Sequence, residues 1–518
     1  MRVPNQESLS RSANVTALSN SFACPIGLPQ TWRFSRLASR RRPIIESVPR
    51  AFVIGSGPNG FAAAIHAAMA GMRVEVFEAE QVPGGAARTL PLTAPGYLHD
   101  FGSAVHPMAA GSPFFRSLPL EQHGLEWIHA DIPLAHPFDD GSAAVLLRDL
   151  DAACSALGRD GRAWRNLHEP LAAHWESFAQ DALGPLLRFP DQPFRMAGFG
   201  LHAMQPATLL AATRFRDART RALFAGLAAH SFMRLDAPFS AAVGLMLGAA
   251  MHAVGWPMPR GGAQSITQAL LASLEALGGK LHTGRRIESL AQLPDPSGLV
   301  FCDVTPRQLL QIAEGHFTPA YARQLRRYRY GPGAYKIDYA LHSPVPWAAP
   351  ECRRALTVHV GGSISEIAAA EAAVLRGQSP EKPFVLVAQP SLFDSSRAPA
   401  GKHVLWAYCH VPHGSNVDMT ERIEAQIERF APGFRDCILL RRVSTPRTLE
   451  VMNANLIGGD INGGAFTLRQ LLLRPTLHQY ATSNKRIYLC SSSTPPGGGV
   501  HGMCGYHAVE KALLTHGS

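Results

Sequence analysis

A glycine-rich turn between an apolar strand and an alanine-rich helix constrains this chain most. In residues 51–78 (AFVIGSGPNGFAAAIHAAMAGMRVEVFE), the apolar run Phe52–Ile54 predicts a buried strand. Gly71 ends the helix that follows, and a second predicted strand, Arg73–Phe77, leads to Glu78. The glycines have the spacing G-x-G-x-x-G in the strand–turn–helix–strand context that is typical of dinucleotide binding.

Each glycine of this turn has its own physical role. Gly55 permits a tight turn, Gly57 lets a pyrophosphate approach the backbone, and Gly60 lets helix and strand pack closely. The helix N-terminus offers free N–H groups and a positive dipole end to phosphates. Glu78 lies 18 residues beyond Gly60, near the offset of an acid that binds an unphosphorylated ribose, so FAD or NAD is favoured over NADP. The alternative is a glycine-rich turn in an unrelated α/β domain. The expected cofactor contacts here are Gly55, Gly57, Pro58, Asn59, Gly60, Glu78 and Ala79.

Length and cysteine usage restrict the class of protein. At 518 residues, with 46% hydrophobic and 17% charged residues, the chain should form two or three domains of a globular protein. Its eight cysteines contain no C-x-x-C pair. This spacing excludes a zinc ribbon and a thioredoxin-type disulphide and indicates reduced thiols. We find no Ser-His-Asp pattern and no metal-ligand spacing, so no metal is expected.

Most of the net charge of +10 lies at the N-terminus. Residues 1–50 hold eight arginines and two glutamates and lack the apolar core of a secretory signal. We expect residues 1–49 to be a disordered extension, with an organellar transit peptide as the alternative. The expected location is therefore cytoplasmic, with peripheral membrane contact left open, or mitochondrial or plastid if residues 1–49 are a transit peptide. No basic patch interleaved with aromatic residues follows, so nucleic-acid binding is not expected.

A second glycine turn follows the first strand–helix–strand unit. In residues 81–89 (QVPGGAART), paired glycines would let the backbone pass against a flat, bulky group, and the arginine could meet a phosphate. An ordinary β-turn is the alternative. Residues 96–106 (GYLHDFGSAVH) then have the pattern of a strand and a loop. The expected cofactor contacts in this turn are Gly84, Gly85, Arg88 and Thr89.

The C-terminus contains a third glycine turn. A predicted strand, Arg486–Cys490, precedes residues 491–502 (SSSTPPGGGVHG), and a helix is predicted over Tyr506–Leu514. Too few residues follow Gly502 for a second dinucleotide unit. A helix N-terminus here would instead stabilise negative charge on a flavin ring, which selects FAD over NAD. The expected cofactor contacts are Gly498, Gly499, Val500 and His501.

The middle of the chain changes pattern near residue 306. Residues 111–254 have mostly helical periodicity. Within them, Ala241–Val254 is apolar but too short to span a bilayer, so a buried helix is expected. The run Leu183–Phe199 is consistent either with peripheral docking on a membrane or with the apolar lining of a cap. Alternating apolar runs within residues 328–431 predict an antiparallel sheet.

These motifs together resemble a known family. The dinucleotide unit ending in Glu78, the GG(A)xxT-like turn and P-G-Y-x-x-D-x-G (residues 95–102) are similar to the phytoene desaturase branch of the FAD-dependent amine-oxidase-like superfamily. With STPPGGG-x-x-G and the glycine pairs at 458–459 and 463–464, the chain resembles the subgroup that includes pyridine nucleotide-disulphide oxidoreductase domain-containing protein 2. Two departures are Ala86, where many amine oxidases have arginine, and Gln81, where a basic residue often stands.

The resemblance extends from Arg50 to the end and implies an α/β fold. A Rossmann-like, glutathione-reductase-like FAD-binding domain would comprise residues 50–110, 255–305 and 445–518. An inserted α+β substrate domain would comprise a helical cap, residues 111–254, and an antiparallel sheet, residues 306–444.

The resemblance also implies an activity. We expect a flavoprotein that transfers hydride from an apolar substrate (polyene-, lipid- or amine-like) to flavin N5, with oxygen or a quinone as external electron acceptor. The chain has no second nucleotide domain and no redox cysteine pair, so disulphide reduction is not expected. One alternative is a redox-neutral, flavin-dependent isomerase. Another is a non-enzymatic binding protein on the same fold, as in the Rab GDP-dissociation inhibitors, but intact FAD motifs argue against it.

The substrate-side residues are less constrained. Lys336 lies in an otherwise apolar strand, where a charge is costly unless it is paired or used. Related amine oxidases hold a lysine near flavin N5, so Lys336 is a candidate catalytic residue, with a salt bridge to Asp338 as the alternative. His501 is a second candidate, with simple packing of its loop as the alternative. Candidate pocket walls, which could equally be core residues, are His252, Trp256, Tyr335 and Tyr506.

Overall fold

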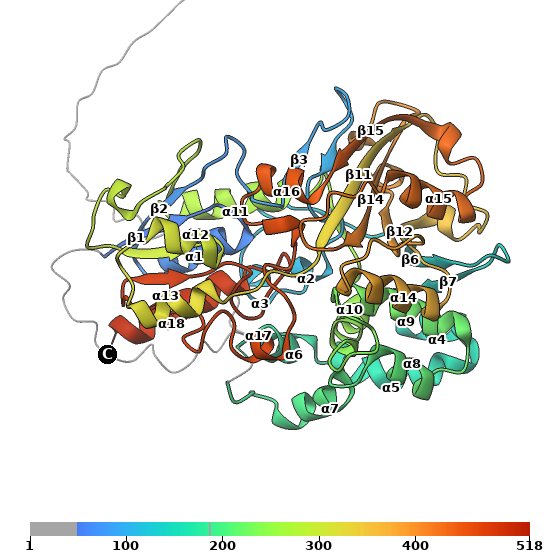
Figure 1. The fold of residues 1–518 in the computed structure, drawn as a ribbon, viewed down its shortest axis with the longest axis horizontal. Helices are drawn as coiled ribbons and strands as arrows, with labels where there is room; N and C mark the ends of the chain where they lie inside the picture. Colours follow the sequence, from blue (N-terminus) through green and yellow to red (C-terminus); the bar gives the residue numbers. More distant parts are fainter. Residues whose placement is uncertain (1–48, 186–187, 518) are drawn as a thin grey trace, which may run out of the picture. The chain divides into compact units, whose positions relative to one another are not determined.

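A five-stranded parallel sheet is built around the N-terminal strand β1. In the computed structural model, which describes residues 49–185 and 188–517, its order is β16–β10–β1–β2–β9. The expected tail, residues 1–49, lies outside the described residues except for residue 49. Both ends and the middle of the chain supply strands (Figure 1). They are β1 (Arg50–Ile54), β2 (Arg73–Phe77), β9 (Lys280–His282), β10 (Leu299–Cys302) and β16 (Ile487–Leu489).

Helices cover both faces of this sheet. Successive side chains of a strand point to opposite faces, and Ala51 and Val53 pack with α1 (Pro58–Met69), α11 (Gln264–Ala276) and α18 (Met503–His516). Phe52 and Ile54 pack with the other two helices, α12 (Pro306–Ile312) and α13 (Pro319–Arg326). The expected Rossmann-like α/β architecture is therefore confirmed.

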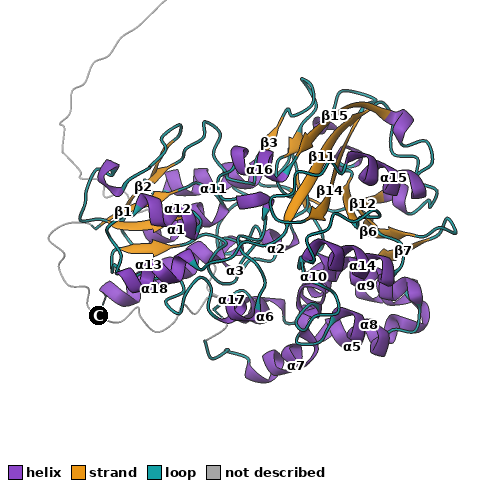
Figure 2. Ribbon diagram, viewed as in Figure 1, coloured by secondary structure: helices purple, strands orange, loops and turns teal. Residues whose placement is uncertain are grey.

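A second sheet of seven strands has the order β15–β11–β14–β13–β12–β6–β7 and is antiparallel except for the pair β12–β6 (Figure 2). Two of its strands come from the segment 111–254, which was expected to be mostly helical, so that expectation is wrong for them. Prolines in the run Ile132–Pro137 (IPLAHP) weaken its strand signal, because proline cannot donate to a ladder. The strands are β6 (Ile132–Pro137), β7 (Ala143–Leu146), β11 (Gly333–Leu341), β12 (Ala355–Val360), β13 (Val385–Ala388), β14 (His403–Val411) and β15 (Ile438–Ser444).

The two faces of the seven-stranded sheet differ in chemistry. One face is apolar and packs under α15 (Thr420–Phe430), whose Ile423 and Ile427 join its core. The opposite face, here called the cap face, packs against the helices of residues 150–253 and α14 (Figure 1). These helices are α4 (Leu150–Ala156), α5 (Gly161–Ala172), α6 (Trp175–Ala182), α7 (Pro193–Ala203), α8 (Ala207–Arg214), α9 (Ala218–Ala229), α10 (Ala241–Ala253) and α14 (Ile364–Leu375).

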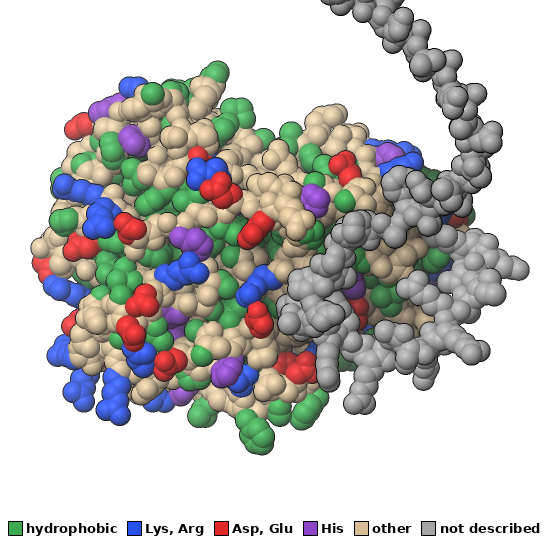
Figure 3. All heavy atoms as spheres, turned by 180° about the vertical axis from the view of Figure 1, so that it is seen from behind, with side chains coloured by type: hydrophobic (Ala, Val, Ile, Leu, Met, Phe, Trp, Pro, Cys, Tyr) green, Lys and Arg blue, Asp and Glu red, His purple; other side chains and the backbone are tan. Residues whose placement is uncertain are grey.

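The helix α10 matches the expected buried helix, with Leu245, Ala249 and Met251 inaccessible. Among the described residues, no helix is both long and apolar enough to cross a bilayer. Acidic and basic side chains are interspersed on the face seen in Figure 3. The remaining elements are β3 (Thr89–Leu90), β4 (His99–Asp100), α2 (Pro107–Ala110), α3 (Pro113–Arg116), β5 (Trp127–Ile128), β8 (Met258–Pro259), α16 (Pro446–Met452) and α17 (Leu468–Leu472).

Candidate functional site

The first glycine turn has the geometry that its sequence predicts. Gly55 has φ +99°, in the region that favours glycine. Gly57 is the N-cap of α1, and Pro58 follows as its first residue. A Cβ atom on Gly60 would lie 2.1 Å from the carbonyl oxygen of Gly55, so the close approach of helix and turn requires glycine.

Glu78 is held beside this turn at the end of β2. Its Oε2 accepts hydrogen bonds from the backbone N–H of Ser56 at 2.9 Å and from the Ser56 hydroxyl at 2.6 Å. Its Oε1 accepts from the N–H of Glu80 at 2.9 Å. The carboxylate is buried, with Ala79 beside it partly buried. Glu78 is therefore fixed in place as an acceptor, while its ribose contact stays a prediction.

The second glycine turn lies against the first. A Cβ on Gly85 would be 3.1 Å from Cα of Gly57, and a Cβ on Gly84 would overlap the hydroxyl of Thr267 at 2.6 Å. Thr89 donates its hydroxyl to Asp100 at 2.8 Å. The two turns thus form one glycine-lined surface at the start of α1.

Arg88 is directed at backbone carbonyls. It donates to Gly85 O at 2.8 Å and to Met452 O at 2.9 Å, and its guanidinium lies 4.9 Å from the ring centre of Phe101. Burial lowers the pKa of Arg88. Two of its donor groups are therefore engaged in holding the turn, and its predicted phosphate contact would have to use the rest.

The C-terminal loop ends on a glycine that begins α18. Gly502 is the N-cap, with φ +69°. Val500 is partly buried, and the His501 carbonyl accepts from the Ser112 hydroxyl at 2.6 Å. His501 Nδ1 accepts from the N–H of Met503 at 3.1 Å, so the neutral ring carries its proton on Nε2.

That Nε2 atom is buried and has no hydrogen-bond partner. Burial lowers the pKa of His501 to about 4, so the ring is neutral near pH 7. An unpartnered buried donor indicates a missing ligand or water. The loop therefore presents a neutral N–H group close to the three consecutive glycines Gly497, Gly498 and Gly499.

The N-termini of α1 and α18 meet. A Cβ on Gly505 would be 1.9 Å from the carbonyl oxygen of Asn59. The amide of Asn59 reaches the Ser492 hydroxyl at 3.5 Å, a long contact that joins the first and third glycine turns. Asn59 Oδ1 is buried without a partner. Two turns that are more than 400 residues apart thus present their backbone N–H groups in one region.

Sequence reasoning missed two charged residues here. Arg474 is buried and donates to the carbonyls of Asn462 at 2.6 Å and Ser492 at 2.8 Å, and its guanidinium carbon would be 3.7 Å from a Cβ on Gly497. Asp303 follows β10 and accepts from the N–H of Gly60 at 3.0 Å. Arg474 lies in a loop without periodicity, and no sequence pattern distinguishes either residue.

Lys336 forms an ion pair with Asp338, as the alternative interpretation expected. Both side chains are buried on the cap face, with the ammonium 5.9 Å from the ring centre of Trp406. Burial lowers the pKa of Lys336, and the charge of Asp338 opposes that shift. His99 Nδ1 lies 3.6 Å from Asp338 Oδ1. The catalytic role of Lys336 stays a prediction.

A second buried pair lies near the first. Arg397 donates to Asp100 Oδ2 at 2.7 Å, and both side chains are fully buried. Burial alone would raise the pKa of Asp100, but the Arg397 guanidinium outweighs it and holds that pKa below its usual value. Two ion pairs therefore adjoin the loop that follows the second glycine turn.

The four candidate pocket residues are not brought together. His252 bonds Trp164 at 2.8 Å within the cap, and Trp256 bonds Thr357 at 3.0 Å on the cap face. Tyr506 packs on His66, with ring centres 4.6 Å apart. The fourth, Tyr335, points to the opposite face of the sheet, where its hydroxyl donates to Asp418 at 2.6 Å.

Tyr335 is therefore removed from the candidate pocket. The sequence did not reveal this because strand alternation fixes which residues share a face, without saying which face meets the cap.

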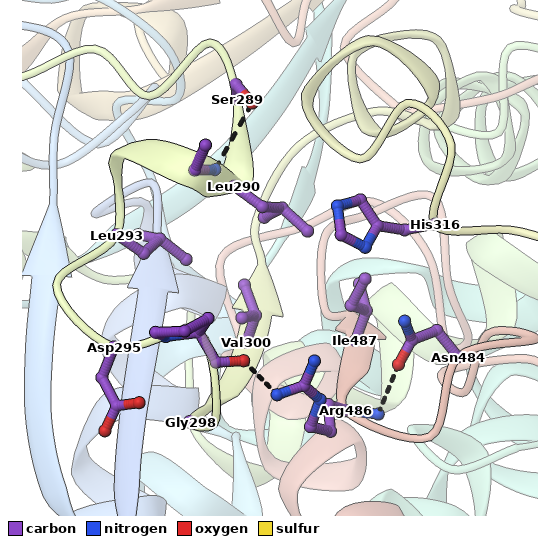
Figure 4. A pocket seen from close by; sticks show the side chains of 12 residues that line it. Ser289, Leu290, Leu293, Asp295, Gly298, Val300, His316, Asn484, Arg486 and Ile487 are labelled. Atoms are coloured by element: carbon purple, nitrogen blue, oxygen red, sulfur yellow. Dashed lines mark hydrogen bonds between the residues drawn. The ribbon is translucent and has the colours of Figure 1, made fainter.

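One described pocket lies away from the glycine turns, beside the outer end of the parallel sheet (Figure 4). Arg486 donates there to the Pro296 carbonyl, and Asn484 Oδ1 accepts from the Arg486 backbone N–H at 3.0 Å. Its polar groups largely satisfy one another. Within the described part of the chain, no group of three His, Cys, Asp or Glu side chains could hold a metal ion.

Comparison with known proteins agrees with this geometry. Residues 53–118 match the family model of an NAD(P)-binding Rossmann-like domain. The chain is 25% identical to mouse (Mus musculus) pyridine nucleotide-disulfide oxidoreductase domain-containing protein 2, covering 95% of this chain and 96% of that protein. It is 25% identical to the all-trans-zeta-carotene desaturase of Myxococcus xanthus, covering 88% and 91%.

The structure is also similar to that of wild-type putrescine oxidase bound to putrescine. The TM-score is 0.56 at 15% identity, over 90% of this chain and 99% of that one. At this identity the likeness shows the fold alone.

The fold, the paired glycine turns and the relatives define a flavin-type oxidoreductase related to carotenoid desaturases and sharing the fold of amine oxidases. The resemblance to these proteins that the sequence motifs predicted is confirmed.

Proposed function

We propose that this protein binds FAD across its glycine turns and transfers hydride from an apolar small molecule to flavin N5. Electrons then leave to an external acceptor, oxygen or a quinone. The observation that carries the proposal is the meeting of the N-termini of α1 and α18, with Glu78 fixed beside the first. Two helix N-termini that face one region suit a ligand with negative charge at both ends.

The residues present fit this cofactor. The first turn and Glu78 would hold the ADP part, and the loop of residues 497–502 would hold the ring part. Asn59 Oδ1 and His501 Nε2 are buried polar atoms without partners, one at each of these places. When bound, the flavin supplies the hydride-accepting chemistry, while the protein orients the substrate and excludes water.

The substrate is proposed to lie between the cap face and the cap helices. This region is dominated by apolar side chains, and the relatives include a carotene desaturase. A polyene- or lipid-like molecule is therefore favoured over a small amine. The buried pair Lys336–Asp338 would be a polar feature near such a substrate.

Peripheral membrane contact in a cytoplasmic protein is part of the proposal. Four large apolar side chains on and around α7 are strongly exposed, Phe194 at 92%. Exposed apolar groups of this kind favour the headgroup boundary of a bilayer, where an apolar substrate would be dissolved. They are Phe189, Phe194, Leu201 and Met204.

Spectroscopy of the full-length protein tests the flavin. Purified protein should absorb near ~450 nm, as flavins do, and lose that absorbance when an apolar polyene is added without oxygen. Re-oxidation by oxygen or a quinone then identifies the acceptor. Product formation without any need for an acceptor would favour the redox-neutral isomerase. Colourless protein that does not take up FAD would contradict the proposal.

Flotation with neutral phospholipid vesicles tests the membrane contact. Phe194→Ser combined with Leu201→Ser should reduce the bound fraction, since both side chains would leave the interface. Val451→Ser, a change of a 75% exposed side chain on α16, is the matched control and should not reduce it. Equal binding of both variants would contradict the α7 surface.

A further inference from the structure

The side chain of Asp303 occupies the start of α1. Its Oδ2 accepts the N–H of Gly60, the third residue of that helix, at 3.0 Å. A Cβ on Gly57 would lie 2.6 Å from the same oxygen. The carboxylate therefore sits where the free N–H groups of the helix point, the place at which the proposed function puts a phosphate.

No positive charge balances this carboxylate. Among the described residues, Asp303 forms no ion pair with lysine, arginine or histidine, although its side chain is almost fully buried. The acidic group that faces it is Glu78, from the end of β2. The thiols around it are Cys302 of its own strand, Cys490 after β16 and Cys504 of α18.

Those thiols stay uncharged near neutral pH, because burial raises their pKa values, to about 12 for Cys302 and Cys504. Burial likewise raises the pKa of Asp303, to about 7, and the charge of Glu78 acts in the same direction. The hydrogen bonds from Gly60 and Gly57 oppose the shift without cancelling it. The side chain thus changes its charge near physiological pH.

A pyrophosphate at the same helix start would meet a like charge when Asp303 is ionised. From this geometry we propose that Asp303 couples FAD binding to the uptake of one proton, so that the cofactor binds tightly only when this carboxyl is protonated. The proposal rests on the proposed FAD site. Because binding takes up one proton, the affinity should fall about tenfold per pH unit above the pKa of the free protein.

The test is a titration of cofactor-free, full-length protein with FAD between pH 6 and 9, followed by flavin fluorescence. The wild-type Kd should rise about tenfold per pH unit above neutrality. Asp303→Asn keeps an acceptor for the Gly60 N–H but cannot ionise, so its Kd should stay flat. Asp131→Asn, a change of an exposed carboxylate, is the matched control and should keep the wild-type slope.

Calorimetry gives an independent readout that needs no variant. Titrations of the wild type at pH 8 in buffers of different ionisation enthalpy should report uptake approaching one proton per FAD bound. If Asp303→Asn does not fold, this measurement decides alone. Binding of FAD with a flat Kd and no proton uptake would overturn the role of Asp303 and leave the FAD site standing. Failure to bind FAD at any pH would overturn both.

Discussion

Gly505 of α18 lies against Asn59 of α1, so closely that a Cβ atom would be 1.9 Å from the Asn59 carbonyl oxygen. The contact sets the distance between two helix N-termini, and with it the size of any ligand that spans them. His66 and Glu510, 2.7 Å apart, join the same two helices further along.

Gly505→Ala should separate these helices. Forcing a methyl group into this contact should destabilise the protein by about 1–3 kcal/mol and should weaken the retention of FAD. Urea unfolding and FAD release during gel filtration measure the two effects. Gly198→Ala in α7, where nothing lies within 4 Å of the new Cβ, is the control and should not destabilise. Wild-type stability of Gly505→Ala would contradict the contact.

Glu78→Ala should weaken FAD binding at every pH, because an acceptor fixed by Ser56 and Glu80 is lost. We expect at least about a tenfold higher Kd, since one hydrogen bond to a charged group contributes about 1.5–3 kcal/mol. Fluorescence titration measures it. Glu80→Gln, whose side chain contacts Arg286 on the surface, serves as the control. Unchanged affinity in Glu78→Ala would contradict the ribose assignment.

The stability of the cofactor-free protein should depend on Asp303 between about pH 4 and pH 7. Its folded pKa is raised, to about 7. The folded state therefore holds a proton that the unfolded chain releases, and the stabilising effect of that proton is lost as the pH rises through this window. Relative to Asp303→Asn, the wild type should lose about 1.4 kcal/mol per pH unit there and stay level above it. Parallel urea titrations of both proteins would show a constant difference if the assignment is wrong.

Lys336→Met should leave the Asp338 carboxylate buried without its partner and cost about 3–5 kcal/mol. Adding Asp338→Leu should recover most of that loss, because an apolar pair can replace a buried ion pair. If Lys336 is catalytic, reduction of the flavin by substrate stays slow in the double variant. Recovery of rate together with stability would assign Lys336 a structural role only.

The sequence predicted the parts of the fold that rest on local pattern. The β1–turn–α1–β2 unit could be predicted because glycine spacing and apolar runs are short-range signals, and the C-terminal loop because its glycines precede a helix. The pairing of these two regions followed from a family resemblance, since local pattern carries no information about contacts more than 400 residues apart. Strand β6 was missed because its prolines imitate a loop.

The charged residues of the site were the hardest to predict. Arg88 was expected at a phosphate, but two of its donor groups bind carbonyls. Asp303 looks like any polar residue at the end of a strand, and its significance depends on Gly57 and Gly60 lying within reach of its oxygen. Tyr335 obeyed the strand alternation but was assigned to the wrong face. In each case the deciding information is a distance in space.

The position of α18 has a consequence for the synthesis of the protein. Strand β1 and helix α1 leave the ribosome first, yet β16 and α18, which complete their sheet and cover α1, are made last. Until residues 503–516 emerge, the apolar side of α1 lacks its partner, and partly folded chains of this kind are prone to aggregate. The cofactor half of the molecule therefore matures after translation, and nascent chains should depend on chaperones throughout elongation.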